Sequence, residues 1–179
     1  MYARPRGEFL TRAASVLRAA RRAGVCVVHV KVSFRPGLPE VSARNKLLAA
    51  IKSSPGHRSL FTDPDGAIDA VLGPERGDII VTKCRVSAFA GTDLLQVLRA
   101  REVRTLVLFG ISTSGAVLAT LLEAADADYE LVVVSDCCAD LDPTLHDALI
   151  SRLIPTHAAV ISASEVVEAL TAVSSDTVD

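Results

Sequence analysis

The segment T-L-V-L-F-G-I-S-T-S-G-A-V-L-A-T, from Thr105 to Thr120, decides the fold of this chain. It begins as a short apolar run, breaks at Gly110 into a hydroxyl-rich turn, and then resumes apolar residues at helical spacing. This order predicts a strand over 105–109 and a helix over about 114–127. Open α/β folds bind ligands where such a strand ends, because backbone N–H groups point there. We therefore expect the functional site at this turn.

Predicted strands and helices alternate along the rest of the chain. Apolar, β-branched runs predict further strands over 25–32, 79–83, 131–135 and 158–161. Apolar residues at helical spacing predict helices over 9–22, 42–51 and 67–72, from Thr92 past Leu98, from Asp142 to Leu153, and from Ser162 onward. Parallel strands need crossover connections, and these place helices on the faces of the sheet. The predicted fold class is therefore α/β, with three α/β/α layers and a mostly parallel sheet.

Local signals mark where the predicted helices begin. Thr92 is a candidate N-cap, and Asp142 places a capping carboxylate directly before Pro143. Ser162 and Glu165 have the spacing of a capping box. The stretches 33–40 and 53–59 contain Pro and Gly and are predicted to be loops.

Size and composition indicate one ordinary globular domain. Of the 179 residues, 50% are hydrophobic and 22% are charged, so we expect a single domain over 1–179, with residues 1–8 and 174–179 flexible. A net charge of −2 and the absence of Trp argue against a nucleic-acid partner. No stretch approaches the roughly 20 apolar residues that span a bilayer, and no apolar signal segment begins the chain. These features predict a cytoplasmic location and no membrane partner.

The cysteine, histidine and arginine residues of the chain are candidate ligand-binding side chains. The 4 cysteines form no C-x-x-C pair, and we expect reduced, partly buried thiols. His29 lies inside the apolar run 25–32, where a lone histidine is more often packed than bound to a ligand. Arg35, in the predicted loop 33–40, either meets an anionic substrate or is solvated.

Three blocks carry a family resemblance: V-T-K-C-R-V-S-A-F-A-G-T-D-L (Val81 to Leu94), G-I-S-T-S-G-A-V-L-A-T (Gly110 to Thr120) and Y-E-L-V-V-V-S-D-C-C-A-D (Tyr129 to Asp140). In this order and at these spacings, the chain resembles the isochorismatase-like, or cysteine hydrolase, superfamily. The resemblance implies a parallel sheet of strand order 3-2-1-4-5-6 flanked by helices, assembly into homo-oligomers, and hydrolysis of small molecules. Most members hydrolyse amides, whereas isochorismatases proper cleave a vinyl ether.

The family's catalytic residues carry over only in part. The resemblance implies that Lys83 is the catalytic lysine, which would lower the pKa of a neighbouring nucleophile or stabilise developing negative charge. The position of the nucleophilic cysteine falls on Ala116, whose methyl group cannot attack a carbonyl. The hydroxyls of Ser112, Thr113 and Ser114 are expected to cap the helix instead, since the sequence positions no histidine to deprotonate them.

The family's first strand, which ends in a catalytic Asp, has no counterpart before the predicted helix 9–22. Met1 to Glu8 contain neither an apolar run nor an Asp, and the missing strand is the central one in the family order. Its loss would leave two rows of ladder groups unpaired. Either the sheet closes up, a partner chain fills the place, or the true start of the protein lies upstream.

The binding features of the family's turn do carry over. The resemblance implies a cis peptide at Ile111-Ser112 and an oxyanion hole of backbone N–H groups near Ser112 and Ala116, which need no particular side chain. Expected substrate-binding residues are therefore Ile111, Ser112, Thr113, Ala116 and Arg35. The histidine pair of metal-binding nicotinamidases is replaced by Ser33 to Glu40, so we expect neither metal nor cofactor.

Two functions follow as hypotheses. The first is a hydrolase of a small carbonyl, amide or vinyl-ether substrate that works without a covalent cysteine. The alternative is a catalytically degenerate member that binds a small molecule or serves as an oligomeric interaction protein. Fold resemblance alone does not choose between them.

Overall fold

The structure, a computed structural model, describes residues 6–62 and 68–175. Its strands are β1 (Val28–Val32), β2 (Ile79–Lys83), β3 (Thr105–Ile111), β4 (Glu130–Ala139) and β5 (Ala159–Ile161). Its α-helices are α1 (Arg6–Arg22), α2 (Lys46–Ser53), α3 (Pro55–Thr62), α4 (Leu94–Ala100), α5 (Leu118–Asp126), α6 (Pro143–Ala148) and α7 (Ala163–Ser175). Short 3₁₀ or π segments are η1 (Ala70–Leu72), η2 (Thr113–Val117), η3 (Leu149–Leu153) and η4 (Ile154–Thr156).

The strands form two parallel sheets instead of the single sheet that the sequence predicts. β1 pairs with β2, and β3, β4 and β5 pair in that order. Within the described residues no ladder joins β1 to β3, so the expectation that the sheet might close up is wrong for this part of the chain. The two sheets are joined by side-chain packing instead, because Val81 of β2 and Val133 of β4 belong to one apolar cluster. The other two expectations, a partner chain and an upstream start, stay predictions.

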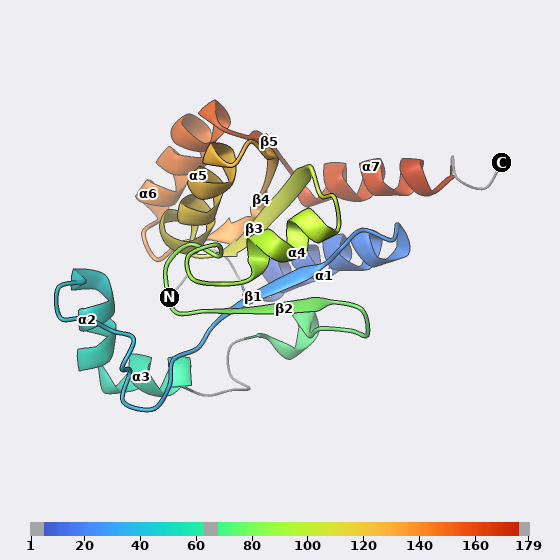
Figure 1. Cartoon of the computed structure of the whole chain (residues 1–179). Coiled ribbons are helices and arrows are strands. Elements are labelled where there is room, and N and C mark those ends of the chain that lie inside the picture. Colours follow the sequence, from blue (N-terminus) through green and yellow to red (C-terminus); the bar gives the residue numbers. More distant parts are fainter. Residues whose placement is uncertain (1–5, 63–67, 176–179) are drawn as a thin grey trace.

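Helices cover the sheets in the predicted layers (Figure 1). On one face α4 and α5 contribute Leu98 and Leu121 to a core that also contains Val81 of β2 and Val133 of β4. On the other face α1 and α7 lie side by side and pack with Val134 of β4. The α/β/α class is therefore confirmed, with the sheet layer divided.

A third apolar cluster lies beyond the carboxyl ends of β1 and β2. Phe34 and Leu48 are buried there, and Phe34 meets Phe61 of α3 edge to face, with ring centroids 6.4 Å apart. Helix α3 corrects the predicted loop over 53–59. Pro55 occupies the first helical position, where its fixed φ and missing N–H favour a helix start.

Element ends differ from the predictions in places. Helix α1 already begins at Arg6 and α7 continues to Ser175, so the described parts of 1–8 and 174–179 are helical. The rest of these two ranges lies outside the described residues, as do 63–67, which precede η1 in the region of the predicted helix 67–72. β1 begins at Val28, and β4 is longer than predicted because its pairing with β3 shifts between Leu108 and Gly110.

Two of the three predicted helix starts have the predicted cap. The Asp142 carboxylate accepts from the Leu145 N–H at 3.1 Å, and Ser162 and Glu165 form the predicted capping box. The N-cap of α4 is Asp93, although the Thr92 hydroxyl accepts from the Leu94 N–H at 3.2 Å. Among the described helices none has both the length and the apolar character to cross a bilayer.

Candidate functional site

The predicted site residues follow the carboxyl ends of three strands. Lys83 ends β2, and the turn from Ser112 to Ala116 follows β3. Arg35 lies in the loop after β1, which pairs in parallel with β2 so that Val32 is level with Lys83. The peptide bond between Ile111 and Ser112 is cis, as the resemblance implies. Lys83 and the loop of Arg35 therefore follow the carboxyl edge of the β1-β2 sheet, and the turn follows the carboxyl end of β3 in the other sheet.

Lys83 is buried although it ends a strand. Its side chain is enclosed so that the residue is 4% exposed, and its ammonium donates to the carbonyl of Val86. No carboxylate among the described residues pairs with it. Burial disfavours the charged form and lowers the pKa of Lys83 to about 8. An uncompensated ammonium of this kind can hold an anionic group or exchange a proton near neutral pH.

The turn after β3 is built as a π-helical segment, η2. The Val117 N–H donates to the Ser112 carbonyl at 3.1 Å, and α5 follows without interruption. Ala116 is partly exposed in this segment. Backbone N–H groups in the first turn of a helix have no preceding carbonyl to bond, and they point toward the strand end.

Two polar contacts that the sequence did not predict hold this turn. The Ser114 N–H donates to the Asp140 carboxylate at 2.7 Å, from the end of β4. The Thr113 hydroxyl lies 2.8 Å from Nδ1 of His146 on α6, and both side chains are buried. The expectation that no histidine lies near these hydroxyls is therefore corrected, because tertiary packing brings α6 onto the turn. Thr113 is 0% exposed as a whole residue, so its hydroxyl serves the packing of the turn.

Asp140 is held as a carboxylate by the same contacts. Burial by itself raises its pKa, but hydrogen bonds from Ser114, Asp142 and Leu141 outweigh that effect and keep the pKa below its usual value. Asp140 is the last residue of the third sequence block, directly after β4. Its position after a strand is the one sequence signal that could have marked it as a site residue. His146 carried none.

Arg35 is mostly in solvent. Its side chain is 77% exposed, and its guanidinium donates to the Glu40 carboxylate at 2.6 Å. Arg35 is therefore an exposed residue of the loop after β1 that already has an internal partner.

His29 belongs to a polar network at the opposite ends of β1 and β2. Its Nε2 lies 3.0 Å from the Asp78 carboxylate, which also accepts from Arg21 of α1 at 2.5 Å. Burial raises the pKa of Asp78, but hydrogen bonds from Arg21, the Glu75 N–H and His29 outweigh it and bring the pKa to about 2. The prediction that His29 is packed is confirmed.

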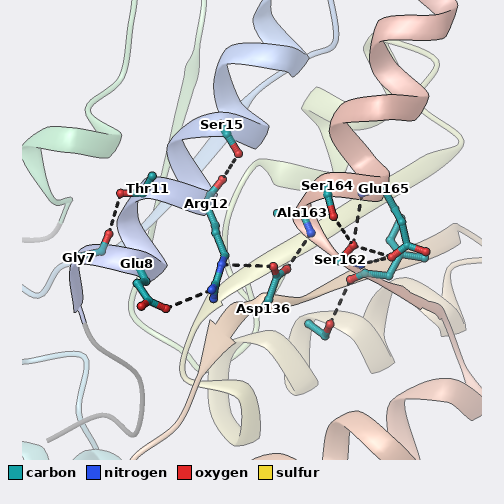
Figure 2. A network of polar contacts seen from close by, with 12 residues as sticks. Gly7, Glu8, Thr11, Arg12, Ser15, Asp136, Ser162, Ala163, Ser164 and Glu165 are labelled. Carbon is teal, nitrogen blue, oxygen red and sulfur yellow. Dashed lines mark hydrogen bonds and ion pairs between the residues drawn. The ribbon is translucent and has the colours of Figure 1, made fainter.

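A second network joins α1 and α7 to β4 (Figure 2). The Asp136 carboxylate accepts from the Ala163 N–H at 2.8 Å and lies 3.7 Å from Arg12 Nε. Arg12 also pairs with Glu8, at 3.1 Å. These contacts fix the starts of both helices against β4, so we assign the network to the fold.

Neither cysteine pairs nor clustered acids suggest a metal. Cys26 and Cys84 are half-buried, whereas Cys137 and Cys138 are buried. Across residues 6–62 and 68–175, no group of three or more histidine, cysteine or acidic side chains has the arrangement to hold a metal ion.

Comparison with known proteins gives consistent matches. The isochorismatase domain matches residues 3–165. Maleamate amidohydrolase from Pseudomonas putida is 27% identical over 89% of this chain and 73% of its own length. A ureidoacrylate amidohydrolase from Methylobacterium radiotolerans is 32% identical over 82% of this chain, but the match spans only 61% of that relative.

A solved structure matches the fold closely. The isochorismatase family protein from Burkholderia thailandensis superposes with a TM-score of 0.81 and 28% sequence identity, covering 96% of this chain and 87% of that one. The two separated sheets therefore occupy positions that fit a known architecture.

Proposed function

The chain belongs to the isochorismatase family, and on that premise we propose that it is a hydrolase of a small amide or related carbonyl compound that works without a covalent cysteine. The observation that carries the proposal is Lys83, a buried ammonium at a strand end with no described counter-charge. The names of the amidohydrolase relatives favour an amide over a vinyl ether.

In the proposed reaction, water is the nucleophile, because the methyl group of Ala116 cannot attack. The neutral Lys83 amine, which is populated near its pKa of about 8, takes a proton from the attacking water. The carbonyl oxygen becomes an oxyanion, and backbone N–H groups at Ser112 and Ala116 stabilise it. The C–N bond then breaks, Lys83 returns the proton to the departing nitrogen, and a carboxylic acid and an amine or ammonia leave.

Supporting positions divide into those that touch the substrate and those that hold the turn. Ile111, Ser112 and Ala116 would contact the substrate through the backbone of the turn. Asp140 and His146 act through Ser114 and Thr113, and they are positioning residues. The hydrolase would take a small-molecule substrate and, by its family, assemble as a homo-oligomer.

A second candidate function is binding without turnover. Two features favour binding without turnover. Ala116 stands where the family resemblance implies a cysteine, and the sheet that carries Lys83 is not joined to the sheet that carries the turn. In this case the turn and Lys83 would bind a small carbonyl compound, and no bond would break.

The test compares two lysine variants in an ammonia-release assay on a panel of small primary amides. We expect wild-type protein to release ammonia with a rate that falls below about pH 8, because protonated Lys83 cannot accept a proton. Lys83→Met should lose at least about 100-fold in rate, the lower range for general base catalysis. Lys46→Met, which removes an exposed lysine at the start of α2, is the matched control.

Absence of ammonia release from folded wild-type protein would overturn the hydrolase proposal. Amide binding by that protein, measured by calorimetry and lost in Lys83→Met, would then support the binding function. Equal activity of Lys83→Met and Lys46→Met would remove Lys83 from the mechanism.

A further inference from the structure

An open pocket of about 310 Å³ lies where the loops after β1 and β2 meet the start of α2. Its lining combines charged, polar and apolar side chains, namely Glu40, Ser42, Arg44, Asn45, Leu48 and Arg85. No residue of this lining is among the predicted site residues. We infer that this pocket binds the carboxylate of an anionic small molecule through Arg44 and Arg85.

The charge balance of the pocket favours an anion. Glu40 is its one acidic lining residue, and its charge is already paired with Arg35 at 2.6 Å. Arg44 makes no side-chain bond to any described residue, and Arg85 reaches backbone carbonyls and a thiol but no carboxylate. Two guanidinium charges therefore remain uncompensated around one opening, and planar guanidinium groups match carboxylates in geometry.

Arg85 is fixed in place before any ligand arrives. One guanidinium nitrogen donates to the Cys84 carbonyl at 2.7 Å, and another donates to the Glu40 carbonyl at 3.2 Å. A guanidinium has five N–H donors, so these bonds leave donors for a ligand. A side chain held in this way loses less conformational entropy on binding than a free arginine does.

Neutral groups complete the pocket. Leu48 is buried beneath it, and the Asn45 side-chain carbonyl caps α2 by accepting from the Leu48 N–H at 3.0 Å. The Asn45 amide nitrogen, which is not needed for this cap, can donate to a ligand. The pocket thus offers donors at its charged side and an apolar floor, which suits a short organic acid better than an inorganic ion.

The pocket adjoins the proposed active edge along the chain. Arg85 is two residues after Lys83, and the Ser33 N–H that begins the other loop donates to the Lys83 carbonyl at 3.0 Å. Assigning the bound carboxylate to a substrate rests on the proposed function, whereas the existence of the pocket's anion site does not.

The experiment titrates the whole chain with maleate, a non-hydrolysable dicarboxylate, by isothermal calorimetry. We expect saturable binding that weakens at least about tenfold in Arg44→Gln and in Arg85→Gln, since each variant removes one charge-assisted contact to the carboxylate. The control Arg101→Gln removes an exposed arginine at the end of α4 and should bind as wild type does. Amide NMR signals of Ser42 and Asn45 should shift on binding.

Absence of saturable binding, or equal weakening in all three arginine variants, would overturn the inference. Tighter binding of inorganic phosphate than of maleate would overturn the assignment to a carboxylate. Because maleate is not hydrolysed, binding with no amidase activity counts only against the proposed function, and amidase activity with no maleate binding counts only against the pocket.

Discussion

The two sheets of the molecule differ in how many of their faces are covered. In β4 the consecutive residues Val133 and Val134 are each 0% exposed, because helices pack on both sides. In β2 Val81 is 1% exposed, but its neighbour Ile80 is 48% exposed. Successive side chains of a strand point to opposite faces. The central strand β4 is therefore covered on both faces, whereas β2 is fully covered on one.

The less covered sheet has a compensating polar attachment. Arg21 of α1 binds Asp78 at the start of β2, and Asp78 in turn meets His29 of β1. All three side chains are largely removed from solvent, so each needs its partners. The comparison teaches that both sheets have charged attachments to α1, and that the attachment of the smaller sheet is the more deeply buried of the two.

The largest expected effect tests the apolar packing of the β3-β4-β5 sheet. Leu121 of α5 is fully buried against the β3-β4-β5 sheet, and Leu121→Ala should lower the free energy of unfolding by about 2–5 kcal/mol through lost burial and a cavity. The control Ile80→Ala truncates an exposed apolar side chain of β2 and should cost less than about 1 kcal/mol. Urea unfolding measures both. Equal losses would mean that the two sheets are covered alike.

An intermediate effect tests the polar attachment. Asp78→Asn should cost about 1–3 kcal/mol, because it weakens the partner of a largely buried Arg21. The pKa of Asp78 is about 2 in the folded chain and 3.8 ordinarily, so its stabilising contribution is present above pH 3.8 and is lost as the pH falls through 2. The stability gap between wild type and variant should therefore narrow on acidification. A gap independent of pH would contradict this assignment.

The smallest expected effect concerns an exposed ion pair, whose contribution to stability is compared with that of the buried pair at Asp78. Arg35→Gln removes the pair with Glu40 in the loop after β1, where the arginine is largely solvated. Such pairs contribute less than about 1 kcal/mol. The unfolding temperature of Arg35→Gln should lie close to that of wild type and well above that of Asp78→Asn. A loss as large as that of Asp78→Asn would show that exposure does not separate the two networks.

Much of the fold followed from the sequence because its signals were local. The strand over Ile79–Lys83 and the capping box at Ser162 depend on residues within a few positions of one another. The sequence does not predict helix α3, because Pro55 is typical of loops, although proline is also favourable in the first helical turn. Its helical form is supported by the distant contact between Phe34 and Phe61.

The candidate site was predictable to a lesser degree. Lys83 and the turn at Ser112 lie at strand ends, where sequence reasoning expects ligands. His146 and the pocket arginines could not be found in this way, because His146 meets Thr113 across 33 positions of sequence, and the Glu40 carbonyl meets Arg85 across 45. Contacts of such separation have no periodic signature.

The sequence by itself determined the α/β alternation, the family, the place of Lys83 and the alanine at position 116. Each of these depends on residue identity or on spacing along a short segment. Only the tertiary structure decided that the strands divide into two sheets, that the Lys83 ammonium is buried without a described carboxylate, and that two arginines surround one pocket. These features arise from packing between distant segments, where burial and charge are set by neighbours that the linear order does not reveal.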